Sequence, residues 1–365
     1  MKQNDASDLY LSVGRAPSFK INGTVRPAGK LPLTAEMIDG LTAEVLSTKE
    51  LDELKEKKEL NMAHANDELG RFRFNFYKQK GSTAVVVRKI ETIIKTLDEL
   101  RLPNTLKEIS MAKRGLVLVV GATGSGKSTT LAAMINHRNE SEAGHIITIE
   151  DPVEFVHDHK KCVVSQREVG VDTDSFKMAL KNTLRQAPTV ILIGEVRDEE
   201  TMEHAINFAE TGHLCLATLH SNNANQAIER VLNFFPPERH RQVYLQLSLN
   251  LKAIVSQRLI KTKDGGRAPA IEVLLGTARV RELMKKGDIE TLKDAMAQGE
   301  NEGMQTFDQA LFELFREGRL GLEEALSNAD SVTDLKLRIK LAVASGDLES
   351  SPVEGPVDGL SLDAL

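Results

Sequence analysis

The chain has 365 residues, which at about 150 residues per domain predicts two or three domains. Its 47 basic and 53 acidic residues give a net charge of −6, so it lacks the broad basic surface of most nucleic-acid-binding proteins. Two cysteines exclude a disulfide framework and a four-cysteine zinc site, and the lack of a signal peptide and of any apolar run near the roughly 18 residues of a membrane span predicts a cytoplasmic protein.

The first hundred residues mix short strands with amphipathic helices. Apolar residues recur at helical spacing after Thr34, and Ser47 with Glu50 forms a capping box that starts a second helix. Turn residues separate the strand-like runs. Strands are predicted at residues 9–13 and 18–25, and helices at 34–46 and from 48 to about 60.

The segment from Arg71 to Tyr77 alternates with a strict period of two. Three phenylalanines fall on one face of the predicted strand, and polar residues and Tyr77 fall on the other. A second strand at 83–90 follows the turn Gly81-Ser82 and carries Arg88. The pattern predicts a small α+β domain with a buried phenylalanine face, formed by Phe72, Phe74 and Phe76, and an arginine-bearing face that includes Arg73.

After Leu116 the chain changes to short, uniformly apolar runs separated by helical segments. Strands of this kind are typical of a parallel sheet that is covered on both faces. The predicted strands are residues 116–120, 146–149, 190–193 and 214–218. Farther on, we predict a helical stretch at 236–259, a strand at 269–275, and helices from 277 to about 344.

Residues Gly121–Ser128 read Gly-Ala-Thr-Gly-Ser-Gly-Lys-Ser and match the motif G-x-x-x-x-G-K-[ST] in full. A predicted strand precedes the motif and a helical run, 129–139, follows it, as a phosphate-binding loop requires. Lys127 is predicted to face the β- and γ-phosphates of ATP, and Ser128 to bind Mg²⁺. The predicted nucleotide-binding residues are Gly121, Ala122, Thr123, Gly124, Ser125, Gly126, Lys127, Ser128 and Thr129.

Acidic residues follow two later strands of the same predicted sheet. The segment Glu150–Glu154 comes at a strand end, where a carboxylate can polarise an attacking water. A second strand resembles a Walker B strand, but Gly194 takes the place of the usual Asp and the acid is displaced to Glu195. Glu195 is therefore predicted to order water, or Mg²⁺ through water. His220 ends a third strand and is a candidate γ-phosphate sensor.

Together these motifs resemble the secretion-type AAA+/RecA-like ATPases, and most closely the type IV pilus retraction motors of the PilT/PilU family. The resemblance extends to about residue 340. The matching segments are an opening strand at 6–14, an Asp box at 148–155, a Walker B segment at 193–198 in which Gly before Glu is normal, a His box at 209–220, and the family phrases at 166–170 and 303–306.

The resemblance implies an α/β protein with four parts. These are an N-terminal PAS-like α+β domain at 1–97, a linker at 98–108, a RecA-like P-loop ATPase domain with C-terminal helices at 109–345, and an acidic tail at 346–365 that is predicted to be disordered. It also implies a hexamer that holds ATP and Mg²⁺ between the two domains. The implied catalytic residues are Glu154, Glu195, Arg73, Arg88 and His220, with the arginines offsetting charge on the transferring phosphoryl group.

The family's activity would make this chain an ATP-hydrolysing motor for pilus retraction and twitching motility, at the cytoplasmic face of the bacterial inner membrane. Departures from the family at Lys80-Gly81, 184–188 and 278–285 favour the PilU branch. The resemblance then implies an accessory motor that acts with a PilT-type partner and the inner-membrane platform protein. It implies no nucleic-acid ligand and membrane contact only through partners.

Three alternatives remain open at this point. An extension or secretion motor of the same superfamily usually adds an N-terminal domain and a four-cysteine zinc module, and this sequence has neither. A RecA-like nucleic-acid motor would show a basic, aromatic channel, whereas this chain is acidic and contains no Trp. A non-hydrolysing assembly factor is disfavoured by the intact Lys127, Ser128, Glu154 and Glu195.

Overall fold

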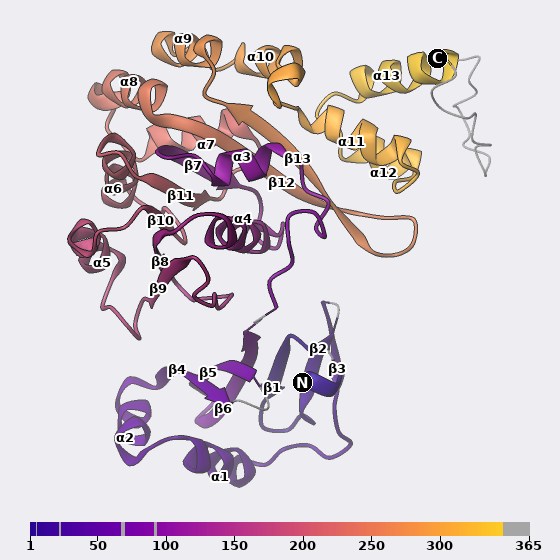
Figure 1. Ribbon diagram of the computed structural model, residues 1–365. Helices are drawn as coiled ribbons and strands as arrows, with labels where there is room; N and C mark the ends of the chain where they lie inside the picture. The colour runs from indigo at the N-terminus through magenta and orange to yellow at the C-terminus, as the bar shows by residue number, and fades with distance from the viewer. Residues whose placement is uncertain (5, 22, 67–69, 91–92, 346–365) are drawn as a thin grey trace. The chain divides into compact units, whose positions relative to one another are not determined.

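The computed structural model describes residues 1–345 apart from 5, 22, 67–69 and 91–92 (Figure 1). The predicted acidic tail at 346–365 lies outside the described residues. Contacts divide the chain into two compact units, each built from separate stretches of sequence. The first unit comprises Met1–Leu100, Leu106–Leu116 and Ser128–Thr218, and the second comprises Arg101–Thr105, Val117–Lys127 and the chain from Leu219 onward.

The N-terminal part of the first unit is a six-stranded antiparallel sheet in the order β3-β2-β1-β6-β5-β4. Helices α1 and α2 pack against this sheet. Its elements are η1 (Lys2–Asn4), β1 (Asp8–Leu11), β2 (Ser18–Ile21), β3 (Thr24–Pro27), α1 (Ala35–Val45), α2 (Thr48–Lys57), β4 (Glu59–Asn66), β5 (Gly70–Gln79) and β6 (Ser82–Ile90).

The phenylalanine face of β5 packs against the apolar core, as its alternating pattern predicts, with Phe76 buried and Phe72 and Phe74 half-buried. Phe76 is only 2% exposed, and Phe72 and Phe74 pack against the same apolar cluster, which includes Ile38 of α1 and Leu54 of α2. Burial of this stripe drives the sheet and the two helices together, because removing apolar surface from water contributes about 25 cal/mol per Å². The opposite face of β5 remains available for its polar side chains.

The second helix starts as predicted but ends earlier. Ser47 and Glu50 form the capping box, in which the Glu50 carboxylate accepts from the Ser47 backbone N–H at 2.8 Å. The helix ends at Lys57, and β4 begins at Glu59, where the sequence analysis predicts helix. Lys58 adopts φ +63°, a left-handed conformation that usually calls for Gly. Without a Gly, nothing in the sequence marks this helix end.

The second sheet has seven strands in the order β13-β12-β7-β11-β10-β8-β9. Its strands β8 to β11 pair in parallel, while β12 and β13 form an antiparallel hairpin. The strands are β7 (Gly115–Val120), β8 (Gly144–Glu150), β9 (Cys162–Glu168), β10 (Val190–Ile193), β11 (Leu214–Leu219), β12 (Leu251–Lys261) and β13 (Arg267–Leu275). Helix α3 (Thr105–Ser110) precedes the first of these strands, and the helices between them are α4 (Lys127–Ser141), α5 (Phe176–Thr183), η2 (Leu184–Gln186), α6 (Glu199–Glu210), α7 (Ala224–Asn233), η3 (Pro237–Arg239) and α8 (His240–Asn250).

The predicted helical stretch at 236–259 is wrong from Leu251 onward. Helix α8 ends at Asn250, and β12 follows without a loop. Residues 253–257 of β12 are all buried, because the strand is covered on both faces. A strand of this kind shows no alternation of polar and apolar residues, so its apolar spacing is readily mistaken for that of a buried helix.

Helices dominate the C-terminal third, as predicted. The bounds are α9 (Ala278–Lys286), α10 (Leu292–Gln298), η4 (Glu300–Glu302), α11 (Phe307–Arg316), α12 (Leu322–Ser327) and α13 (Val332–Ala344). Helices α11 to α13 share one apolar cluster with the β12–β13 hairpin, with Phe307 and Leu311 fully buried in it. Within the described residues, no helix is both long enough and apolar enough for a membrane crossing.

Candidate nucleotide-binding site

The phosphate-binding loop runs between β7 and α4 and packs against β12. Gly121 and Gly126 both have positive φ, +154° and +91°. A Cβ atom on Gly121 would lie 2.5 Å from the backbone oxygen of Gln257, and one on Gly126 would lie 2.7 Å from the Gln257 side-chain nitrogen. Gly121 is therefore required twice, for the turn of the loop and for its close approach to the backbone of β12, whereas Gly126 is required for its positive φ.

The side chains of the loop form a polar cradle. Lys127 is 9% exposed, and its Nζ donates to the backbone oxygens of Gly121 at 2.8 Å and Ala122 at 3.0 Å. Ser125 Oγ is buried and has no hydrogen-bond partner among the described residues. A buried ammonium and an unsatisfied hydroxyl in a glycine-rich loop fit a phosphate group. Ser128 and Thr129 occupy the first turn of α4.

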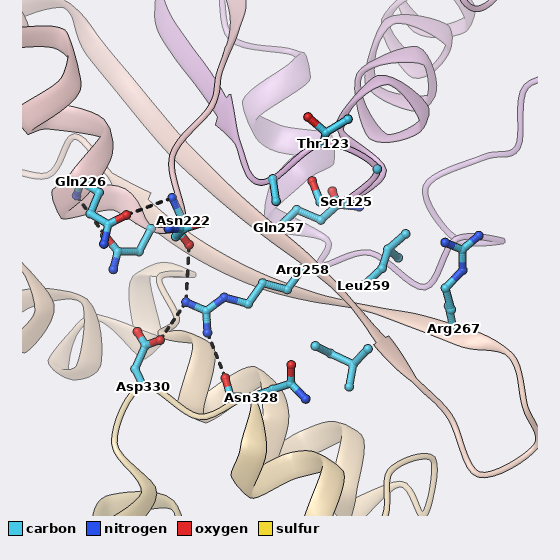
Figure 2. Close-up of a pocket in the computed structure, with 14 residues that line it drawn as sticks. Thr123, Ser125, Asn222, Gln226, Gln257, Arg258, Leu259, Arg267, Asn328 and Asp330 are labelled. Carbon is cyan, nitrogen blue, oxygen red and sulfur yellow. Dashed lines mark hydrogen bonds and ion pairs between the residues drawn. The ribbon is translucent and has the colours of Figure 1, made fainter. Parts of the chain in front are cut away.

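A cavity of about 580 Å³ opens beside this loop within the second unit (Figure 2). Its walls are the loop from Ala122 to Ser125, the turn at Asn222, strand β12 and the segment that carries Asp330. The volume lies in the range of small-molecule and cofactor pockets. His220 lines a smaller adjoining cavity of about 300 Å³ that also touches Ala122. Four of the predicted loop residues, Ala122 to Ser125, and His220 thus border two neighbouring cavities.

The acidic strand ends lie in the first unit. Gly194 follows β10, and its N–H donates to the Ile149 backbone oxygen of β8 at 2.7 Å. A Cβ atom on Gly194 would lie only 3.0 Å from Glu150 Cα. The two strand ends therefore approach closely at position 194, so a side chain there would force its neighbours to shift, and the acid of this Walker B segment stands at the next position, Glu195.

The carboxylates at these strand ends differ in burial. Burial raises the pKa of Glu150 to about 7, an effect that hydrogen bonds from Thr148 and Gln166 oppose. Glu154 is exposed. Glu195 is partly buried and accepts from Arg197 at 2.7 Å. These strand ends thus carry one half-buried carboxyl with a raised pKa, Glu150, and two carboxylates that solvent reaches, Glu154 and Glu195.

The two predicted arginines lie directly beside each other on neighbouring strands of the N-terminal sheet. Arg73 of β5 pairs in register with Arg88 of β6, and Arg88 pairs in register with Asp8 of β1. Arg88 Nε donates to the buried Asp8 carboxylate at 2.8 Å, and Arg73 lies 4.0 Å from Glu168. Like charges directly opposite each other are unfavourable, so these acids offset the repulsion. Electrostatic attraction to Glu154 also raises the pKa of Arg88, after the larger effect of Asp8.

Comparison with known proteins places the chain in a family. A sequence profile for "Type II/IV secretion system protein" matches residues 61–332. Type IV pilus ATPase PilU of Pseudomonas aeruginosa is 52% identical over 364 residues, which cover 100% of this chain and 94% of that protein. The chain belongs to the PilT/PilU family of secretion ATPases. It is accordingly an ATP-hydrolysing enzyme.

Two further relatives of this PilT/PilU-family ATPase bear on its fold. Type IV pilus retractation ATPase PilT of Pseudomonas aeruginosa is 41% identical over 324 residues, covering 89% of this chain and 94% of that protein. The crystal structure of the pilus retraction motor PilT with bound ADP superposes with a TM-score of 0.85 at 39% identity, covering 92% of this chain and 96% of that one. The mixed α/β fold predicted from sequence is thereby confirmed.

Within this ATPase the predicted site residues divide between the two units. Gly121 to Lys127 and His220 belong to the second unit, whereas Ser128, Thr129, the acidic residues and both arginines belong to the first. Two partners are not predicted from the sequence: Asp8, which pairs with Arg88, and Gln257, which lies beneath the loop. For Gln257 the sequence offers one local signal, a polar residue within an apolar run.

Proposed function

We propose that this ATPase is a hexameric motor that powers type IV pilus retraction and twitching motility from the cytoplasmic face of the bacterial inner membrane. The observation that carries the proposal is the 52% identity to a PilU along the whole chain, against 41% to a PilT of the same organism. That difference favours the accessory PilU-type role, beside a PilT-type partner and on the platform protein, with no nucleic-acid ligand. An extension or secretion motor of the same superfamily is the alternative.

We propose the following roles for the site residues. Lys127 neutralises the β- and γ-phosphates, and Ser128 binds Mg²⁺ with Glu195 acting through water. Glu154 polarises the attacking water, and His220 senses the γ-phosphate. The N-terminal sheet with α1 and α2 is proposed to be the PAS-like domain at 1–97, joined by a linker at 98–108 to the RecA-like part at 109–345. Mg²⁺ would supply charge neutralisation on the phosphates.

Arg73 and Arg88 are proposed to stabilise charge on the transferring phosphoryl group. Arg73→Ala and Arg88→Lys are each expected to slow ATP hydrolysis by about 10³-fold while changing nucleotide affinity far less. The lysine at position 88 retains a cation beside the buried Asp8, so the sheet should stay folded. Steady-state ATPase assays, nucleotide titration and circular dichroism test this. Full activity in both variants would exclude the role.

The cellular role is tested by deleting the gene and complementing it with the wild-type chain or with Lys127→Ala. The deletion strain should still assemble pili, but retraction should fail under load, and surface motility should be poor. Wild-type protein should restore retraction force, measured with micropillars or optical tweezers, and Lys127→Ala should not. Loss of pilus assembly itself would refute the proposal and point to an extension motor. Light scattering of the purified chain with ATP tests the hexamer.

A further inference from the structure

Arg258 of β12 contacts three separate segments beside the large cavity, and Figure 2 shows its bonds to two of them, one at Asn222 and one at Asn328 and Asp330. Its Nη1 donates to the Asn328 backbone oxygen at 2.9 Å, and its Nη2 donates to Asp330 at 2.8 Å and to the Asn222 backbone oxygen at 3.5 Å. The guanidinium carbon lies 3.8 Å from the ring centroid of Phe307. One side chain thus joins the turn after β11 to the start of α11 and to the segment between α12 and α13.

The residue before Arg258 contacts the phosphate-binding loop. Gln257 is 3% exposed, and its backbone oxygen lies so close to Gly121 that this position has no room for a Cβ atom, while its side-chain nitrogen lies 2.7 Å from the place of a Cβ atom on Gly126. Successive side chains of a strand point to opposite faces, so Gln257 meets the loop while Arg258 turns to the C-terminal helices. Strand β12 therefore links these helices directly to the loop.

The turn that Arg258 holds leads from His220 into α7. Asn222 lies two residues after His220, and the next residue, Asn223, caps α7 by accepting from the Gln226 N–H at 2.9 Å. The Asn222 N–H in turn donates to the Gln226 side chain at 3.3 Å. These local contacts tie the turn to α7, and the Arg258 bond ties it to the C-terminal helices.

The anchor for Arg258 is itself held firmly. Asp330 has a 17% exposed side chain, and its backbone N–H donates to Asp308 at 2.7 Å. Lys293 lies 3.6 Å from the Asp330 carboxylate and 3.8 Å from that of Asp308. Charge-assisted hydrogen bonds and a cation over a buried ring are strong where water is largely excluded. Only a planar guanidinium can satisfy all these contacts at once.

We propose that Arg258 is a positioning residue that holds the His220 turn in place from helices α11 to α13, so that ATP turnover depends on the docking of these helices. The inference rests on the proposed role of His220. In this role Arg258 touches no reacting atom. It acts through the backbone of Asn222, and the C-terminal helices become part of the support for the nucleotide cavity.

The test compares Arg258→Lys with Arg316→Lys in the full-length chain. Arg316 pairs with Glu313 on the exposed face of α11 and serves as the matched control. Arg258→Lys should lower kcat about tenfold with little change in KM, the scale of a modest loss of positioning, and should speed amide exchange at residues 220–223. Arg316→Lys should change neither kcat nor the rate of amide exchange at residues 220–223. If Arg258→Lys fails to fold, Asp330→Asn removes the anchor charge and takes its place.

A double-mutant cycle with His220→Ala separates positioning from a general structural effect. If Arg258 acts through the His220 turn, Arg258→Lys should cost little further kcat in the His220→Ala background. An equal loss in both backgrounds would overturn the inference. Should His220→Ala keep full turnover, the proposed role of His220 fails. In that case amide exchange at 220–223 tests the role of Arg258 by itself. Faster exchange in Arg258→Lys supports its positioning role, and unchanged exchange overturns it.

Discussion

Replacing Lys127 with alanine should abolish ATP hydrolysis and weaken ATP binding. The Lys127 ammonium is buried in the loop, where it donates to the carbonyls of Gly121 and Ala122. Where little water is present, a cation that faces the phosphates strongly stabilises their charge in the transition state. Losing it should lower the rate of hydrolysis by about 10³-fold or more. Phosphate release and nucleotide titration of the purified variant measure the two effects.

The control for this experiment is Lys113→Ala, because Lys113 is exposed and lies before β7 rather than in the loop. It should hydrolyse ATP at the wild-type rate. Circular dichroism should show both variants folded, since Lys127→Ala removes no apolar contact from the sheet. Near-normal turnover by Lys127→Ala would mean that the loop does not bind the phosphates.

Replacing Glu154 with glutamine should leave nucleotide binding largely intact and slow hydrolysis by about 10²-fold or more, the effect of losing general-base help. The amide preserves the shape of the side chain and removes its basicity. Glu154 is exposed at the end of the acidic segment, where a water can reach it. Single-turnover hydrolysis, measured alongside nucleotide affinity, separates the chemical step from binding.

Glu150→Gln is the informative comparison for that variant. Burial raises the pKa of Glu150 to about 7, so near neutral pH this carboxyl is partly protonated. A general base must be ionised, so if Glu150 were the base, kcat should rise with pH through about 7 and level off above it. A larger loss in Glu150→Gln than in Glu154→Gln, together with that pH profile, would assign the base to Glu150.

Features of this protein that depend on a few consecutive residues are readable from its sequence. The phosphate-binding loop can be recognised from eight consecutive residues, because its glycines and its lysine lie in one short stretch of the chain. The strand with Phe72, Phe74 and Phe76 is equally local, since a period of two leaves only one face to bury. The capping box at Ser47 closes within four residues. Relatives of known fold agree with the α/β architecture inferred from these patterns.

Other features depend on which distant segments meet, and only the tertiary structure decided them. Strand β12 is buried on both faces, so it carries no alternation, and the contact of Gln257 with the loop depends on sheet order rather than on spacing. The pairing of Asp8 with Arg88 depends on strand register across 80 residues. The raised pKa of Glu150 reflects desolvation by packed neighbours. Register, close approach and desolvation are properties of the assembled sheets, and no short stretch of sequence contains them.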